Sequence, residues 1–264
     1  MEQKIIYYKD ELNDEFSGAE INPRKIDENY KYIHKNPVWI ILAFLFNCLM
    51  FPIKIIYPKV KFRIRYIGKE KLKKYKKTGY FVYVNHTQPF CDTFIPSNPI
   101  FPKRNYIIVN PENVSMPVFG NSIQMLGAIP IPDNKKAMKN FLNKIETVIH
   151  KKYAITIYPE AHIWPYYTKI RPFKAVSFKY PVDLDVPTFC MTNTYQRRGK
   201  TDKINIVTSI DGPFFPNKSL GKQEQKQDLR NQVYEQMMER SKNCNIEHIK
   251  YVKVLEDAKN INDC

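Results

Sequence analysis

Cysteine is scarce in this sequence and is not arranged for cross-linking. The five cysteines are an odd set, and none of them forms a Cys-x-x-Cys pair. Disulfide frameworks and zinc ribbons need paired cysteines at short spacings, so the pattern argues against both. We therefore expect a protein of a reducing compartment, without a structural metal.

Acidic residues are few in comparison with basic ones. The chain has 26 Asp and Glu against 42 Lys and Arg, which gives a formal net charge of +16. This charge favours polyanions or an anionic lipid surface as partners, but does not choose between them. The basic residues are spread along the chain without a recognised nucleic-acid module, so we do not expect a nucleic-acid partner.

A secretory leader is also lacking, and long apolar runs are limited to one. Residues 1–16 are charged and mixed in sign, so we expect no signal sequence. The apolar run covers residues 38–53 and is interrupted by Asn47 and Pro52. As a helix it would be about 24 Å long, against about 30 Å for the hydrocarbon layer of a bilayer.

Basic residues flank this apolar run on both sides. Such flanks favour both ends staying on the cytoplasmic face, with the run re-entrant or lying in the membrane interface. A buried core helix is the alternative interpretation. We accordingly predict an N-terminal region, 1–57, whose segment at about 38–53 associates with the membrane.

The rest of the chain alternates between strand-like and helical patterns. Strands are predicted at 61–67, 80–84, 104–110, 153–160, 186–195 and 203–210, and helices near 116–126, after Asn134 and at 221–242. Alternation of this kind predicts an α/β domain over 58–264, with a mixed, largely parallel central sheet flanked by helices.

Two polar stretches follow predicted strands, where ligands of open α/β sheets gather. "NHTQPFCD" begins at Asn85, and "YPEAH" begins at Tyr158. A histidine can take a proton from an attacking hydroxyl when an acid orients its ring, so His86 and Asp92 are a candidate dyad. A structurally bonded pair explains the same spacing. Without a G-x-S-x-G nucleophile, the hydroxyl of a substrate would attack directly.

Four stretches in order, "NHTQPFCD", "LGAIPIPDN", "IYPEAH" and "VPTFCMT", resemble the sequence blocks of the glycerophospholipid acyltransferases. This is the family of 1-acyl-sn-glycerol-3-phosphate acyltransferase, and the resemblance covers about residues 60–210. It implies that His86 is the general base and that Asp92 orients it. It also implies that Asn85, Thr87 and Glu160 belong to the substrate-binding site.

The sequence departs from the family pattern at several positions. Five residues separate His86 from Asp92, where the family has four. Asp133 stands where the family has an arginine that binds the phosphate of the acceptor, so we expect this contact from Lys135 or Arg171, with Lys136 and Lys169 as further candidates. Ala161 and His162 replace a Gly-Thr pair, and Cys190 replaces a proline.

The resemblance implies a membrane-associated acyltransferase at the cytoplasmic face of a membrane. Its acyl donor would be an acyl-CoA or acyl carrier protein thioester, a substrate and not a bound cofactor. Its acceptor would be the free hydroxyl of a lysophospholipid, in the first place 1-acylglycerol 3-phosphate. Two alternatives stay open: an acyltransferase for another lysolipid or a glycolipid, and a catalytically weak lipid-binding protein of the same fold.

Overall fold

Seven strands form the central sheet of the structure, a computed structural model that describes residues 3–16, 18, 21–116, 120–201 and 203–254. The spatial order of the strands is β2-β8-β7-β3-β6-β4-β5. β7 and β8 are antiparallel, and the other neighbouring pairs are parallel. The prediction of a mixed, largely parallel sheet is confirmed. The strands are Arg65–Ile67 (β2), Tyr80–Val84 (β3), Asn105–Val109 (β4), Ala128–Pro130 (β5), Ala154–Ile157 (β6), Thr188–Arg197 (β7) and Ile204–Phe214 (β8).

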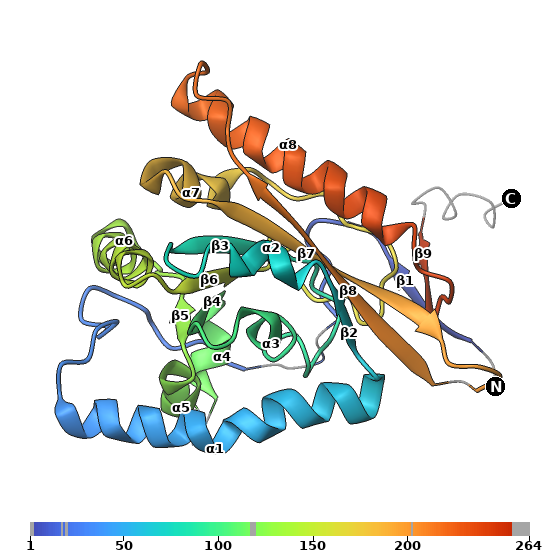
Figure 1. Cartoon of the computed structure of the whole chain (residues 1–264), viewed down its shortest axis with the longest axis horizontal. Coiled ribbons are helices and arrows are strands. Elements are labelled where there is room, and N and C mark those ends of the chain that lie inside the picture. Colours follow the sequence, from blue (N-terminus) through green and yellow to red (C-terminus); the bar gives the residue numbers. More distant parts are fainter. Residues whose placement is uncertain (1–2, 17, 19–20, 117–119, 202, 255–264) are drawn as a thin grey trace, which may run out of the picture.

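Helices cover both faces of this sheet (Figure 1). One face carries α6 (Lys135–His150), α7 (Lys179–Leu184) and α8 (Lys222–Ser241), and the other carries α2 (Lys69–Lys73) and α3 (Ser97–Ile100). The shorter elements are α4 (Pro111–Ser115), α5 (Gly120–Met125) and a 3₁₀ turn at Val176–Phe178. α5 takes the second half of the helix predicted near 116–126, of which residues 117–119 lie outside the described residues.

The central strand β3 shows why both faces need a cover. All five of its residues, YFVYV, are buried. Phe81 and Tyr83 pack on the α6, α7 and α8 side, whereas Tyr80, Val82 and Val84 pack on the α2 and α3 side. A continuous apolar run is what a strand covered on both faces requires. The carboxyl end of β3, which precedes His86, is therefore fixed in the core.

Helix α1, Pro37–Phe62, is much longer than the predicted segment at 38–53. Its 26 residues continue through Pro52 and Pro58, because apolar residues such as Ile56 and Val60 carry the pattern onward. At about 1.5 Å per residue it measures about 39 Å, so the argument that it is too short to cross a bilayer was wrong. Within the described residues it is the one helix long and apolar enough to do so.

The surface of α1 excludes the alternative of a buried core helix. Only Ala43, Pro58 and Phe62 are buried, whereas Phe44 and Leu49 are each 66% exposed. The helix runs along the edge of the molecule and packs on α5 and α3 (Figure 1). One side of α1 is therefore bound to the protein, and the other presents apolar side chains outward.

The two ends of the described chain meet in a second, two-stranded sheet that the sequence pattern did not predict. β1 (Lys4–Tyr8) pairs in parallel with β9 (Ile249–Lys253). Beside them Tyr8 and Tyr251 pack on Trp164, which is fully buried, in the loop after β6. Residues from both sides of the predicted boundary at 57 and 58 thus build one body.

Candidate active site

A cavity of about 520 Å³ lies at the carboxyl ends of β3, β4 and β6. His86, Asp92, Tyr158 and Glu160 line its polar part. The remaining wall is largely apolar and includes Ile107, Val109, Ile131, Met138, Ile157, Phe173, Val176 and Tyr180. The predicted polar residues therefore face a space that suits a partly apolar ligand.

The structure brings the side chains of His86 and Asp92 together. The His86 Nδ1 atom lies 2.7 Å from Asp92 Oδ2, which also accepts a hydrogen bond of 3.0 Å from the Gln88 N–H. Asp92 is only 4% exposed. Burial raises the pKa of its carboxyl, and the bonds from His86 and Gln88 act in the opposite direction. An Nδ1–H bonded to the carboxylate leaves the Nε2 lone pair of His86 free for a substrate.

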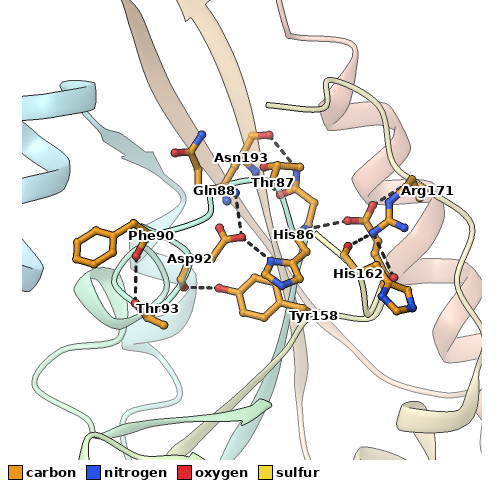
Figure 2. A network of polar contacts seen from close by, with 12 residues as sticks. His86, Thr87, Gln88, Phe90, Asp92, Thr93, Tyr158, His162, Arg171 and Asn193 are labelled. Atoms are coloured by element: carbon orange, nitrogen blue, oxygen red, sulfur yellow. Dashed lines mark hydrogen bonds and ion pairs between the residues drawn. The ribbon is translucent and has the colours of Figure 1, made fainter. Parts of the chain in front are cut away.

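Two tyrosines fix the turn that links this pair, although it is one residue longer than in the family. The Tyr195 hydroxyl, from β7, lies 2.7 Å from Thr87 Oγ1 and accepts a 3.0 Å hydrogen bond from Gln88 Nε2. At the other end of the turn, the Tyr158 hydroxyl donates to the Asp92 carbonyl (Figure 2). The middle of the turn bulges outward, where Phe90 is 57% exposed.

The loop after β6 is bonded directly to the turn between His86 and Asp92 through Glu160. This carboxylate is 4% exposed and accepts 2.8 Å hydrogen bonds from the His86 N–H and the Arg171 N–H. The Trp164 N–H returns a bond of 3.1 Å to the His86 carbonyl. Burial raises the pKa of Glu160, and the charge of Arg171 opposes that rise. Glu160 borders the cavity, but both of its carboxylate oxygens bond to the backbone and connect the turn at His86 with the loop at Arg171.

Arg171, a predicted phosphate ligand, is instead bonded to the backbone. The residue is 1% exposed, and its guanidinium donates to the carbonyls of Glu11 and Glu160. It also donates to the carbonyl of His162 (Figure 2). Its Cζ atom also lies 4.9 Å from the ring centre of Trp164. Its Nη atoms are bonded inside the protein, its Nε atom is buried without a partner, and the residue does not line the cavity.

The other predicted substrate contacts need the same correction. Lys135 is exposed at the first residue of α6, outside the cavity wall. Asn85 exchanges two hydrogen bonds with the backbone of Asn193, at 3.1 and 2.8 Å, and Thr87 bonds to Tyr195 behind the turn. Asn85 and Thr87 are each 1% exposed. Their contacts support the turn, and neither residue lines the cavity.

Asp133, which replaces the phosphate-binding arginine of the family, has a structural partner. Its Oδ2 atom accepts a hydrogen bond of 2.6 Å from the N–H of Ile26. Ile26 is fully buried, so this bond holds the segment before α1 on the core. A second replaced position, Ala161, has a φ of 62°, a left-handed conformation that a glycine adopts without strain.

Sequence reasoning missed Tyr158 and Tyr195 as supports and Lys174 as a cavity residue. Among the described residues that line the cavity, Lys174 is the one lysine or arginine. The sequence "RPFK" shows that Lys174 closely follows Arg171. Only the path of the loop in the structure shows that Lys174, and not Arg171, lines the cavity. The tyrosines carried no signal, because nothing in the residues around them shows which backbone or side-chain groups their hydroxyls reach.

One cysteine, Cys91, directly precedes Asp92 in the turn. It is fully buried, and burial raises the pKa of its thiol to about 12. No group of three His, Cys, Asp or Glu side chains in the described part of the chain could hold a metal ion.

Comparisons with known proteins agree with the predicted family and fold. A family model described as acyltransferase matches residues 63–194, half of the chain. The crystal structure of the 1-acyl-sn-glycerophosphate (LPA) acyltransferase PlsC from Thermotoga maritima is similar, with a TM-score of 0.54 and 16% identity. The match covers 79% of this chain and 89% of that one, and it shows a shared fold. No curated protein matches the sequence.

Proposed function

The chain belongs to the acyltransferase family, and from this premise we propose that it moves a fatty acyl group from an acyl-CoA or acyl carrier protein thioester to a lysophospholipid. The proposed acceptor is 1-acylglycerol 3-phosphate. One observation carries the proposal: the bonded pair of His86 and Asp92 borders a largely apolar cavity. Lipids and thioesters are substrates here, and the proposal includes no bound cofactor.

In the proposed reaction His86 acts as the general base. Its Nε2 atom takes the proton of the acceptor hydroxyl while the hydroxyl oxygen attacks the thioester carbonyl. Asp92, bonded to Nδ1, holds the ring in the required tautomer and stabilises the imidazolium. The new C–O bond forms, the C–S bond breaks, and the proton passes from Nε2 to the leaving thiolate. No covalent intermediate with the protein is needed.

The substrates explain the outer surface of α1. A long acyl chain and a lysolipid are both held in a membrane, and α1 exposes apolar residues along most of its length. Because α1 packs on α5 and α3, we propose that it lies in the membrane interface on the cytoplasmic side. The net charge of +16 would add attraction to anionic lipids.

Lys174 is our candidate for binding the phosphate of the acceptor. It borders the cavity that contains His86, whereas Arg171 is committed to backbone carbonyls. A lysine ammonium makes charge-assisted hydrogen bonds to phosphate oxygens. One observation favours the alternative acceptor, a lysolipid or glycolipid without a phosphate monoester. Asp133 replaces the phosphate-binding arginine of the family, and its carboxylate is bonded to the Ile26 N–H.

The proposal is tested by measuring thiol release from acyl-CoA, and separately from acyl carrier protein, with 1-acylglycerol 3-phosphate present. We expect release with the unaltered protein and a loss of at least about a hundredfold with His86→Ala, because general-base catalysis contributes about that much or more. Circular dichroism and thermal unfolding check that the variant is folded. Near-normal release by a folded His86→Ala protein would reject the base assignment.

A panel of acceptors then decides between the two acceptor classes. Lys174→Met should raise KM for 1-acylglycerol 3-phosphate by about tenfold, the worth of one charge-assisted bond, and leave kcat nearly unchanged. With a phosphate-free lysolipid the same variant should match the unaltered protein. Thiol release that requires a phosphate-free acceptor would support the alternative, and no release with any acceptor would support the lipid-binding protein.

A further inference from the structure

Three basic side chains gather near the amino end of β4, away from the catalytic cavity. Lys54 comes from α1, Arg104 directly precedes β4, and Lys144 comes from α6. The Arg104 Cζ and the Lys144 Nζ lie 4.8 and 4.9 Å from the ring centre of Tyr106. The cavity meets β4 at its other end, where Val109 is part of the wall. We call these three residues the basic cluster.

A chain of contacts connects Lys54 to Arg104. The Arg104 Nη2 atom donates a 2.9 Å hydrogen bond to the Met125 carbonyl, and Asn47 Nδ2 donates to the same oxygen at 2.9 Å. Lys54 Nζ in turn lies 3.4 Å from Asn47 Oδ1. The cluster therefore lies where α1, the end of α5 and the start of β4 meet.

Acidic partners are missing from the basic cluster within the described residues. The ion pairs found there join other residues, and none includes Lys54, Arg104 or Lys144. The Arg104 Nε atom is buried and has no hydrogen-bond partner. Partly buried cations are normally paired, since an unpaired charge loses hydration without compensation. An anion from outside the chain would supply what is missing.

The titration behaviour of the lysines agrees with this geometry. Burial lowers the pKa of Lys54, and the neighbouring Arg104 lowers it further. The same two causes, together with Lys151, lower the pKa of Lys144 to about 8. Like charges in the cluster therefore oppose one another, and a bound anion would relieve this repulsion.

We propose that Lys54, Arg104 and Lys144 form a binding site for the phosphate group of an anionic membrane lipid. A guanidinium with free N–H groups and flanking ammonium groups are the donors that phosphate oxygens require. Lys54 lies in the second half of α1, whose outward side is apolar, so the cluster would be near the lipid headgroups when α1 lies in the interface. This inference depends on the proposed membrane attachment, but not on the proposed reaction.

The test is binding of the full chain to lipid vesicles, measured by flotation. Vesicles of phosphatidylcholine alone are compared with vesicles that also contain phosphatidate. We expect stronger binding to the anionic vesicles, and about a thirtyfold reduction of that binding for the R104Q/K144Q variant, from about fivefold per basic residue near the surface. The matched control is K136Q/K139Q, which removes the same charge from exposed positions of α6.

The control variant should change binding by less than about threefold if the effect belongs to a site, because exposed charges away from the surface are screened. Equal losses in the two variants would mean diffuse attraction and would overturn the proposal. Undiminished binding by R104Q/K144Q would overturn it as well. Equal binding of the unaltered protein to neutral and anionic vesicles would reject the lipid-phosphate site but agree with membrane attachment through α1. Failure to bind either kind of vesicle would reject the membrane attachment.

Inorganic phosphate separates the lipid headgroup from a soluble source of the same chemistry. If the site accepts free phosphate, millimolar phosphate should raise the Tm of the unaltered protein and leave R104Q/K144Q unchanged. A rise in Tm without anionic vesicle binding would assign the site to a soluble phosphate and overturn the lipid. Without any anion, the Tm of R104Q/K144Q should equal or exceed that of the unaltered protein, which excludes misfolding as the cause of lost binding.

Discussion

The turn from His86 to Asp92, with its neighbouring loop, differs from the basic cluster in whether its charged side chains have partners of opposite charge inside the chain. In the turn and its neighbouring loop, both carboxylate oxygens of Glu160 accept hydrogen bonds from the chain, and the Arg171 guanidinium donates to three carbonyls. In the basic cluster, Arg104 keeps a buried Nε atom without a partner, and no described carboxylate approaches. Charges that are compensated inside the chain position their neighbours, whereas the uncompensated charges of the basic cluster are the ones that an outside anion would stabilise.

The largest effect on turnover is expected from the loss of the Asp92 carboxylate. Asp92→Asn should lower kcat about a thousandfold, because an amide neither stabilises the imidazolium nor fixes the tautomer of His86. Steady-state thiol release measures the loss. The double variant with His86→Ala should be no slower than His86→Ala alone, since the two residues act as one unit. A turnover within a few fold of normal for Asp92→Asn would contradict the dyad.

Replacing Arg171 and replacing Arg104 together with Lys144 should have different effects on the free energy of unfolding. Arg171→Met should lower the free energy of unfolding by about 3 kcal/mol or more, because Glu160 would stay buried without its cation. R104Q/K144Q should leave the free energy of unfolding unchanged or raise it. Urea unfolding at constant m-value makes the comparison. A stable Arg171→Met protein would show that the contacts of Arg171 contribute little.

The smallest effect on turnover and stability is expected from removing the Tyr195 hydroxyl, which lies behind the turn between His86 and Asp92. Tyr195→Phe removes the bonds to Thr87 and Gln88, and should lower stability by about 1 kcal/mol and kcat by about three- to tenfold. The pH profile of kcat should shift as well, because the orientation of His86 toward Asp92 loosens. Tyr80→Phe is the control, since Tyr80 is equally buried and no hydrogen bond joins its hydroxyl to the described residues. If both variants behave alike, Tyr195 does not position the turn.

Local patterns in the sequence were sufficient for much of the fold. The apolar run of β3 and the stripe of α6 after its cap Asn134, whose side chain accepts from the Ala137 N–H at 2.9 Å, were both predicted from neighbouring residues alone. The pairing of β1 with β9 was not predictable in this way, because the two strands are about 240 residues apart and each is short and mixed in polarity.

The candidate site was predictable in its centre but not at its edge. Strand-end placement made His86 and Asp92 candidates, and the resemblance of four sequence blocks to one family selected them; their side chains lie 2.7 Å apart. Neither could distinguish Arg171 from Lys174, which are only three residues apart and have the same charge. Which of them reaches the cavity depends on how Trp164 and Tyr251 hold the loop, and this is a property of the tertiary structure.

The pairing of β1 with β9 also has a consequence for the order in which the molecule matures on the ribosome. Tyr251 stacks on Trp164 at 4.9 Å, and Trp164 donates to the His86 carbonyl, so the loop that braces the histidine needs a residue that is made long after the loop itself. A nascent chain can build β3 and the turn between His86 and Asp92 early. Its bracing loop becomes complete only after Ile249–Lys253 has emerged from the exit tunnel.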